Sequence, residues 1–185
     1  LIIDCDQIIN FAAESHVDRS IANAKPFIDS NILGVFTILE SLKKHDKKFI
    51  QISTDEVFGD LKTGSAVEDS CLNPSSPYSS SKASAELLIN SYIITYGIRA
   101  NITRCTNNYG PRQFIEKLIP KTIKCINDGK QIPLHGDGSY VRDWLYVKDN
   151  VEGILYLIEK SIKNKTQIVN DVSRNSTSNL MHTAH

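Results

Sequence analysis

The sequence lacks both a membrane-spanning run and an export leader. None of its apolar stretches approaches the roughly 20 residues that cross a bilayer. No basic segment followed by an apolar one opens the chain. These absences predict a cytoplasmic, soluble protein that has no membrane partner.

Net charge is missing as well. The 185 residues include 21 Lys and Arg and 21 Asp and Glu, so the charges cancel. A neutral chain offers no bulk electrostatic attraction to nucleic acid or to anionic lipid. We therefore expect no nucleic-acid partner. The length and the 41% content of hydrophobic residues are sufficient for a domain with a substantial core.

Cysteine is sparse, and no pair of cysteines has CxxC spacing. This pattern argues against a zinc site and a disulfide framework, and it favours reduced thiols. His16 has no partner at metal-ligand spacing, so we expect no metal and interpret His16 as a structural group. Internal repeats and low-complexity tracts are also absent. The cysteines are Cys5, Cys71, Cys105 and Cys125.

The chain begins without an initiating methionine. It opens on Leu1 and almost directly enters a strand-like run. The last residues, 181–185, complete no recognisable element. We expect a fragment of a longer protein, cut at both ends.

Short apolar runs alternate with apolar stripes at helical spacing, which predict strands and helices respectively. A stretch rich in Gly, Pro and Ser over 59–77 predicts a loop, and Gly97 suits a left-handed helix C-cap. This alternation predicts an α/β protein with a parallel sheet and right-handed crossovers. The expected strands are 8–13, 48–53 and 98–103, and the expected helices are 31–44, 79–96 and 116–128.

Polar segments follow each expected strand. They comprise residues 12–15, 54–56 and 105–108. Ligands of parallel sheets bind beyond the carboxyl ends of the strands. We therefore expect these three segments to converge on one edge of the sheet and to form the site.

Tyr78 and Lys82 are four residues apart at the start of an expected helix, so they share one helix face. A tyrosine with a pKa of about 10 is a poor base at neutral pH, but a nearby ammonium favours the phenolate. The pair is a candidate for proton transfer from an alcohol. Tyr and Lys at this spacing also occur on ordinary solvated helix faces. The preceding strand end and Pro-rich loop favour the catalytic interpretation.

Asp55 and Glu56 follow the strand that ends in Ser53 and Thr54. Adjacent carboxylates at a strand end usually face solvent or cap a turn. Two carboxylates whose environments separate their pKa values can instead divide into an acid and a base. The residues alone leave both interpretations open.

Several blocks resemble the nucleotide-sugar 4,6-dehydratases, which are extended short-chain dehydrogenase/reductases. The resemblance covers Ile8 to about Leu157, and it is strongest to the branch that acts on dTDP-glucose. It implies a Rossmann-like doubly wound parallel sheet, without its N-terminal strands, and part of a small substrate-binding domain. The matching blocks are 11–20, 53–60, Tyr78 with Lys82, 104–111, 116–120 and 142–147.

The resemblance implies an NAD-dependent dehydration that yields a 4-keto-6-deoxy sugar nucleotide. Tyr78 would take the proton of the 4-hydroxyl, and Thr54 would hydrogen-bond the 4-oxygen. Glu56 would remove the C5 proton while Asp55 protonates the departing 6-hydroxyl. Lys82 would bind the nicotinamide ribose and tune Tyr78. The related 4-epimerases share the hydroxyl, Tyr and Lys but lack the carboxylate pair.

Further contacts follow from the same resemblance. NAD-binding positions are Phe11, Ala12, Ala13, Glu14, Ser15, Ser30, Tyr78, Lys82 and Asn108. Substrate-binding positions are Ser15, Thr54, Asn107, Lys117, Leu118, Pro133, Leu134, His135 and Arg142. The guanidinium of Arg142 suits the diphosphate because it presents a fork to phosphate oxygens. The implied NAD-binding domain is 1–112 with 141–170, and the substrate-binding portion is 113–140 with 171–185.

The sequence departs from the family at a few places. The glycine-rich phosphate loop and the ribose-binding acid that precede these blocks are not in it, so we expect the isolated segment to bind NAD poorly. Phe58 stands where Tyr is common, and Ile115 where Pro is common. The resemblance also implies a homodimer through the helices 31–44 and 79–96. The alternatives are a UDP- or CDP-sugar dehydratase, a 4-epimerase, and a catalytically silent protein that kept the fold.

Overall fold

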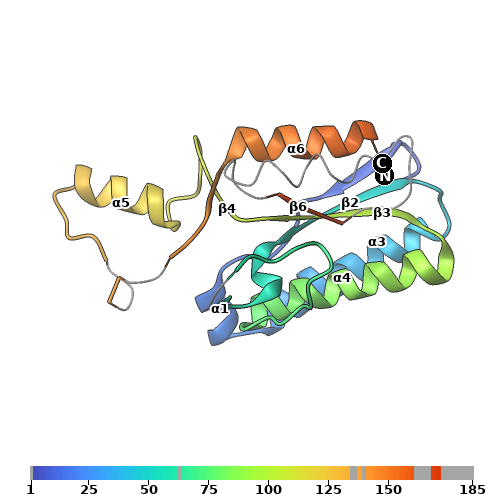
Figure 1. The fold of residues 1–185 in the computed structure, drawn as a ribbon, viewed down its shortest axis with the longest axis horizontal. Coiled ribbons are helices and arrows are strands. Elements are labelled where there is room, and N and C mark those ends of the chain that lie inside the picture. Colours follow the sequence, from blue (N-terminus) through green and yellow to red (C-terminus); the bar gives the residue numbers. More distant parts are fainter. Residues whose placement is uncertain (1, 62–63, 134–136, 139–140, 161–167, 172–185) are drawn as a thin grey trace. The chain divides into compact units, whose positions relative to one another are not determined.

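The computed structural model describes residues 2–61, 64–133, 137–138, 141–160 and 168–171. Its first compact unit comprises 1–105 and 154–171 and contains a parallel four-stranded sheet. The strand order is β1-β2-β3-β6 (Figure 1). The strands are β1 (Gln7–Asn10), β2 (Lys48–Thr54), β3 (Arg99–Cys105) and β6 (Ile168–Asp171).

Helices cover both faces of this sheet. The crossover between β1 and β2 contains α1 (Val17–Ala22), α2 (Lys25–Phe27), the π-helical segment η1 (Ile28–Leu33) and α3 (Gly34–Leu42). The helix α4 (Pro77–Tyr96) connects β2 to β3 and lies beside α3 on one face (Figure 1). The second half of α6 (Val147–Lys160) lies on the other face (Figure 1). The predicted doubly wound parallel sheet is confirmed.

An apolar core joins the sheet to α3 and α4. Apolar side chains on one face of each helix pack against apolar residues of β2 and β3. Such apolar strands are expected in a sheet that is covered on both faces. This core fixes the two helices against the strands. Its fully buried members include Val35, Leu39, Phe49, Ile89 and Ile102.

The N-terminus of α4 is defined by a capping box. Ser76 Oγ accepts a hydrogen bond from the backbone N–H of Ser79, and Ser79 Oγ accepts one from the backbone N–H of Ser76. Pro77 occupies the first turn, where its missing N–H costs nothing. The helix ends at Gly97, which adopts the predicted left-handed conformation with φ 68°. Tyr78 therefore lies in the first turn, and Lys82 lies one turn later.

Several element boundaries differ from the sequence-based expectation. The first strand ends at Asn10 because residues 11–16 leave the sheet without regular structure. The helix predicted from residue 31 begins earlier, as the π-helical η1. The predictions for β2, α4 and β3 agree with the structure to within two residues. The elements α1 and α2 and the strands of the second unit were not predicted from the sequence pattern.

The second compact unit comprises 106–153 and 172–185. In its described part, the strands β4 (Asn107–Tyr109) and β5 (Trp144–Tyr146) pair in parallel. The helix α5 (Leu118–Asn127) has no fully buried residue among those described in it. The division at residues 105 and 153 does not itself test the predicted domain functions, which remain predictions.

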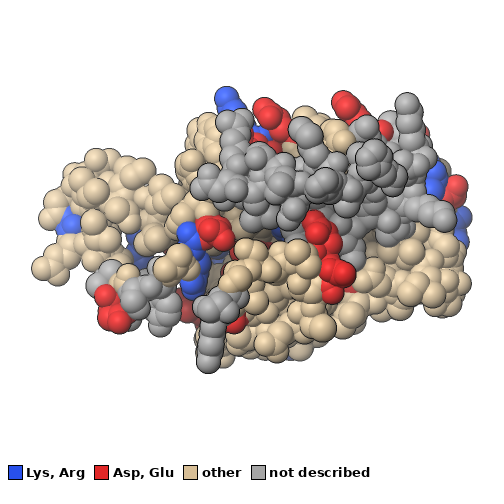
Figure 2. Space-filling model, viewed as in Figure 1, with Lys and Arg blue, Asp and Glu red and all other residues tan. Residues whose placement is uncertain are grey.

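Charged residues are dispersed on the visible surface. On the face drawn in Figure 2, described acidic and basic side chains occur in several places, some of them in contact, and uncharged residues cover most of the remaining described surface. Among the described helices, none is long and apolar enough to cross a membrane.

Gly59 holds a tight turn after β2. Its φ is +71°, and a Cβ built there would lie 2.1 Å from the carbonyl oxygen of Asn73. Any side chain at this position would therefore push two backbone segments apart, whereas Gly97 has no atom within 4 Å of its ideal Cβ.

We expect Gly59→Ala to lower the free energy of unfolding by roughly 3 kcal/mol or more, because it adds a clash to an unfavourable φ. Gly97→Ala carries only the φ penalty, about 1 to 2 kcal/mol. Urea denaturation of both variants compares the two costs. Equal losses would show that Asn73 moves aside freely.

Candidate active site

The end of β2 places a hydroxyl and two carboxylates in one short turn. Thr54 is the last residue of β2, and Asp55–Phe58 form the 3-10 helix η2. Thr54 Oγ1 accepts a hydrogen bond from the backbone N–H of Glu56 at 3.3 Å and donates to Asp55 Oδ1 at 3.2 Å. Thr54 therefore caps the turn. Asp55 and Glu56 are half-buried, so the interpretation as fully solvated carboxylates does not hold.

Tyr78 lies against this turn. Burial raises the pKa of its phenol strongly, and the Glu56 carboxylate raises it further. A hydrogen bond with the Thr54 side chain lowers the pKa, whereas Cys105 and Asp55 add smaller increases. These interactions show that Tyr78 and the strand-end turn are neighbours, as expected from the sequence. The backbone N–H of Tyr78 donates to Ser20 Oγ at 3.1 Å, which ties α4 to α1.

Lys82 is almost fully buried at the same edge. Its Nζ donates to the carbonyl oxygen of Ile52 at 2.7 Å. Burial lowers the pKa of the Lys82 ammonium to about 8, with Cys105 and Glu86 acting in the opposite direction. The pKa of Tyr78 is raised rather than lowered, because burial and the Glu56 and Asp55 carboxylates favour the neutral phenol while the Lys82 ammonium bonds to the Ile52 carbonyl.

The segment after β1 is held by two asparagines. Asn10 Oδ1 accepts from the backbone N–H of Ala12 at 3.1 Å. Asn31, buried within η1, brackets Glu14: its Oδ1 accepts from the Glu14 N–H and its Nδ2 donates to the Glu14 carbonyl. Asn31 Nδ2 also donates to Ser81 Oγ at 2.9 Å. Asn31 thus connects the strand-end segment to α4.

Asn31 is not among the predicted site residues. In the sequence it is a polar residue at the start of the expected helix 31–44, just before the apolar stripe that begins at Ile32. The π-helical turn places this asparagine in the interior, and such turns are frequent at functional sites. Of the predicted cofactor positions in the first unit, Phe11, Ala12 and Ser15 are exposed. Ala13, Glu14 and Ser30 are half-buried.

The remaining predicted contacts belong to the second unit. Asn107 Nδ2 donates to the carbonyl of Asp143 at 3.2 Å, and this bond links the ends of β4 and β5. Asn108 Nδ2 donates to the carbonyl of Thr106, and the Asn108 Oδ1 is buried without a hydrogen-bond partner. Lys117 is half-buried at the N-cap of α5.

Other predicted substrate contacts in this unit are exposed or undescribed. Leu118, Pro133 and Arg142 are exposed, and Arg142 donates to the carbonyl of Val141. Leu134 and His135 lie outside the described residues.

Metal ligands are not gathered in the described part of the chain. No group of three or more His, Cys, Asp or Glu side chains there is arranged to hold an ion. The reactive groups that the structure brings together at the edge of the sheet are the Thr54 hydroxyl, the Tyr78 phenol, and the Asp55 and Glu56 carboxylates, with the Lys82 ammonium at the same edge.

Comparison with known proteins identifies the family. The model of the GDP-mannose 4,6 dehydratase family matches residues 2–184, so the chain belongs to that family. This agrees with the resemblance inferred from the sequence blocks. The fold and the strand-end residues described above are therefore those of a member of this family.

Particular relatives narrow the resemblance. The chain is 51% identical over 150 residues to a dTDP-glucose 4,6-dehydratase of Streptomyces griseus, covering 80% of the chain and 46% of the relative. It is 52% identical over 151 residues to the low-salt glycan biosynthesis protein Agl12 of Haloferax volcanii, covering 81% of the chain and 49% of that protein. The chain thus spans about half the length of the curated relatives that it matches.

Solved structures agree. DesIV, a dTDP-glucose 4,6-dehydratase from Streptomyces venezuelae crystallised with NAD and dTDP, has a TM-score of 0.86 at 43% identity, over 89% of this chain and 51% of that chain. A UDP-glucuronic acid 4-epimerase from Bacillus cereus, in complex with UDP-glucuronic acid and NAD, has a TM-score of 0.85 at 33% identity, over 91% and 54%. The dehydratase and the epimerase share this fold, so their activities must differ through residues of their active sites.

Burial of the Lys82 ammonium has a testable consequence for the free energy of unfolding. Its folded pKa of about 8 lies below the ordinary value of 10.5, so the folded state pays for holding the charge. This penalty is fully present below pH 8 and is lost as the pH rises from about 8 toward 10.5.

We expect Lys82→Met to raise the free energy of unfolding at pH 7 by about 1 to 3 kcal/mol, because relief of the buried charge exceeds the loss of one hydrogen bond. The gain should shrink at pH 10. Urea denaturation at both pH values measures it. Lys25→Met, which removes an exposed lysine, is the control and should change little. A Lys82→Met variant less stable than the parent at pH 7 would contradict the argument.

Proposed function

We propose that the protein containing this chain dehydrates a nucleoside-diphosphate glucose, with NAD as cofactor, to its 4-keto-6-deoxy derivative. The proposed substrate is dTDP-glucose. The observation that carries the proposal is the contact between the Thr54–Glu56 turn and Tyr78, which puts an oxidation group and an elimination pair at one sheet edge. The identity to dTDP-glucose 4,6-dehydratases supports the choice of substrate.

The residues present fit a nicotinamide cofactor. The segment after β1 contains the small residues Ala12, Ala13 and Ser15. Asn31 holds the main chain of this segment at Glu14. A buried lysine and tyrosine lie at the adjoining strand end. Bound NAD would accept hydride from C4 of the sugar and later return it to C6. The proposed NAD contacts are Phe11, Ala12, Ala13, Glu14, Ser15, Ser30, Tyr78, Lys82 and Asn108.

Oxidation at C4 requires a group that accepts the hydroxyl proton. Tyr78 is within reach of Thr54, whose hydroxyl also suits the sugar 4-oxygen. Burial raises the pKa of Tyr78, so the phenolate depends on nearby positive charge. Lys82, protonated below about pH 8, supplies such a charge once it turns from the Ile52 carbonyl toward the ribose and the phenol.

Elimination uses Glu56 as a carboxylate base and Asp55 as a protonated carboxylic acid. A ketone at C4 acidifies the C5 proton, which Glu56 removes, while Asp55 protonates the departing 6-hydroxyl. Before substrate binds, the Thr54 hydroxyl donates to Asp55. Each such acid or base typically contributes about 10²- to 10⁴-fold to the rate. A 4-epimerase needs no group for this step.

The substrate contacts and the organisation of the whole protein are part of the proposal. Domain 1–112 with 141–170 binds NAD, and 113–140 with 171–185 forms part of the substrate-binding portion. We further propose a cytoplasmic homodimer. The proposed substrate contacts are Ser15, Thr54, Asn107, Lys117, Leu118, Pro133, Leu134, His135 and Arg142.

The role of Glu56 is tested by Glu56→Gln in the complete protein. The variant keeps the shape of the side chain but cannot take the C5 proton. We expect the reduced-nicotinamide absorbance to appear on mixing with substrate, and product formation to fall by about 10²- to 10⁴-fold. Tyr78→Phe is the matched variant for the first step and should produce neither signal. Normal product formation by Glu56→Gln would refute the assignment.

The nucleotide is tested by incubating the complete protein with dTDP-, UDP- and CDP-glucose. The absorbance that a 4-keto-6-deoxy product develops in base reports dehydration. We expect the highest kcat/KM with dTDP-glucose. Dehydration of another nucleotide sugar would correct the substrate, and interconversion of 4-epimers without a keto product would overturn the dehydratase function.

A further inference from the structure

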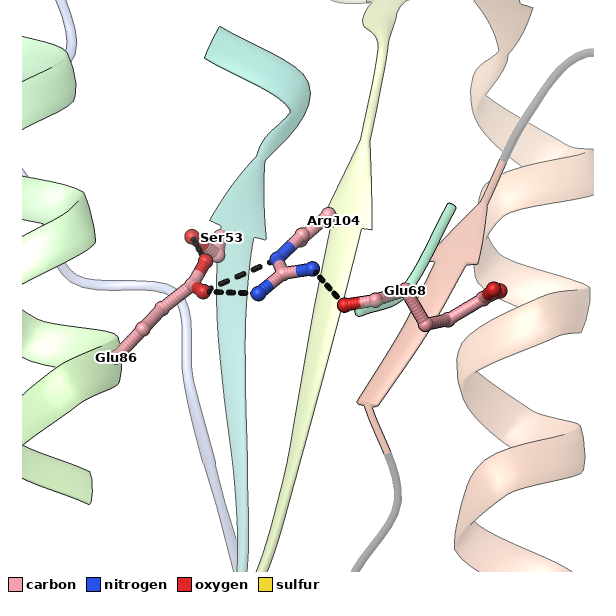
Figure 3. A network of polar contacts seen from close by, with 4 residues as sticks. All are labelled: Ser53, Glu68, Glu86 and Arg104. Atoms are coloured by element: carbon pink, nitrogen blue, oxygen red, sulfur yellow. Dashed lines mark hydrogen bonds and ion pairs between the residues drawn. The ribbon is translucent and has the colours of Figure 1, made fainter. Parts of the chain in front are cut away.

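A buried ion pair lies directly behind the strand-end turn. Arg104 on β3 and Glu86 on α4 have side chains that are 3% and 0% exposed, and Arg104 Nη2 lies 2.7 Å from Glu86 Oε2. Arg104 Nε donates to the same oxygen at 3.0 Å. The other carboxylate oxygen, Oε1, accepts from Ser53 Oγ at 2.5 Å. Figure 3 shows the carboxylate of Glu86 between Ser53 and Arg104.

The pair connects three elements that carry the site. Glu86 lies one helical turn after Lys82 on α4, and Ser53 immediately precedes Thr54 on β2. The bond between Ser53 and Glu86 therefore joins α4 to β2, in addition to the bond from Lys82 and the apolar core. Arg104 adds β3 to this connection.

Arg104 also reaches the segments that follow the carboxylate pair. Its guanidinium carbon lies 4.8 Å from the centroid of the Phe58 ring, and Phe58 closes the η2 helix that contains Asp55 and Glu56. Its Nη1 donates to the carbonyl oxygen of Glu68 at 2.8 Å (Figure 3). Such a guanidinium over an aromatic face is attractive and directional.

The segment around Glu68 folds back onto η2. The backbone N–H of Asn73 donates to the Val57 carbonyl at 2.9 Å, next to the tight turn at Gly59. Ala66 and Leu72 pack on the small cluster formed by Val57, Phe58 and Ala83. Arg104 thus holds the back of η2 through Phe58 and the covering segment through Glu68.

Stability alone does not account for this arrangement. Replacing a buried ion pair by apolar side chains of similar volume is often neutral or stabilising, whereas removal of one partner is costly. The hydrogen bonds of the pair instead impose direction on the elements that they join. What distinguishes Arg104 from an apolar side chain is its simultaneous contact with Glu86, Phe58 and the Glu68 carbonyl.

We propose that Arg104, anchored by Glu86, is a positioning residue that holds the Asp55–Glu56 turn against Tyr78, so that elimination follows oxidation. The inference rests on the proposed dehydratase function for its kinetic readout. Without Arg104, Thr54 and Tyr78 keep their own supports, namely β2 pairing and the capping box of α4. Both η2 and the segment around Glu68 lose their contacts with the Arg104 side chain, whereas Glu86 on α4 loses its cation but keeps its bond to Ser53. The elimination step should therefore suffer more than the oxidation step.

The test compares Arg104→Met with the double substitution Glu86→Leu/Arg104→Met in the complete protein. The single variant leaves the Glu86 carboxylate buried without its cation, and its melting temperature should fall. The double variant should recover most of that loss. We expect kcat to stay about 10- to 100-fold below the parent in the double variant, as for a small misplacement of catalytic groups.

Two further readouts separate positioning from general damage. The KM for the sugar nucleotide should change less than about threefold, because Arg104 is not among the proposed substrate contacts. The fraction of nicotinamide that is reduced during turnover should rise, because oxidation outpaces elimination. Arg104→Lys keeps the charge but loses the fork, so it should restore only part of kcat.

Arg99→Met is the matched control. Arg99 lies on the same strand at its other end, where it forms an exposed ion pair with Asp46. Its replacement should leave kcat and the reduced fraction unchanged. A double Glu86→Leu/Arg104→Met variant with the parent kcat and the parent reduced fraction would overturn the proposal.

Hydrogen exchange makes the test independent of the activity. Amides of residues 57–59 and 68–73 should lose protection in the double variant, whereas those of residues 79–82 should keep it. If the parent protein dehydrates no sugar nucleotide, the proposed function fails, and the exchange result still decides the positioning role. Unchanged protection of residues 57–59 and 68–73 would refute it.

Discussion

The packing of the first half of α4 on the carboxyl ends of β2 and β3 is the constraint on which the site depends. Lys82 bonds to the Ile52 carbonyl, and Glu86 bonds to Ser53. Farther along the helix, Ile89 is fully buried against the strands. The apolar contacts hold α4 against the sheet, whereas the hydrogen bonds of Lys82 and Glu86 fix its orientation relative to the strand ends.

The polar contacts at this end of the interface explain why the ionisable side chains of Tyr78, Lys82 and Glu86 are buried together at the strand ends of the first unit. Burial raises the pKa of Tyr78 and lowers the pKa of Lys82 to about 8, so each neutral form gains relative to its charged form. The shift of Lys82 brings its pKa closer to neutral pH, whereas the shift of Tyr78 takes its pKa further away, so proton transfer by Tyr78 depends on positive charge nearby. The same burial makes the unbound site electrostatically unfavourable, a common relation between stability and function.

Much of this architecture could be predicted from the sequence. Apolar runs located β2 and β3, the C-cap glycine located the end of α4, and the rule for parallel sheets located the site at the strand ends. Asn31 escaped prediction because its role depends on a π-helical turn, which periodicity does not reveal. The raised pKa of Tyr78 escaped because burial is a tertiary property. Arg104 was matched as part of a family block, but its partner Glu86 is 18 positions away and on another element.

The turn at Gly59 has a consequence for how such proteins diversify. The chain leaves η2 at Gly59 and returns to the same place at Asn73, where its N–H bonds to Val57. The intervening stretch is therefore a closed excursion, anchored at both ends. Within it, Ala66 and Leu72 pack on the cluster that includes Val57 and Phe58, and the Glu68 carbonyl accepts from Arg104. Sequence change in this stretch that leaves Asp55 and Glu56 in place is therefore confined to the residues that make none of these contacts.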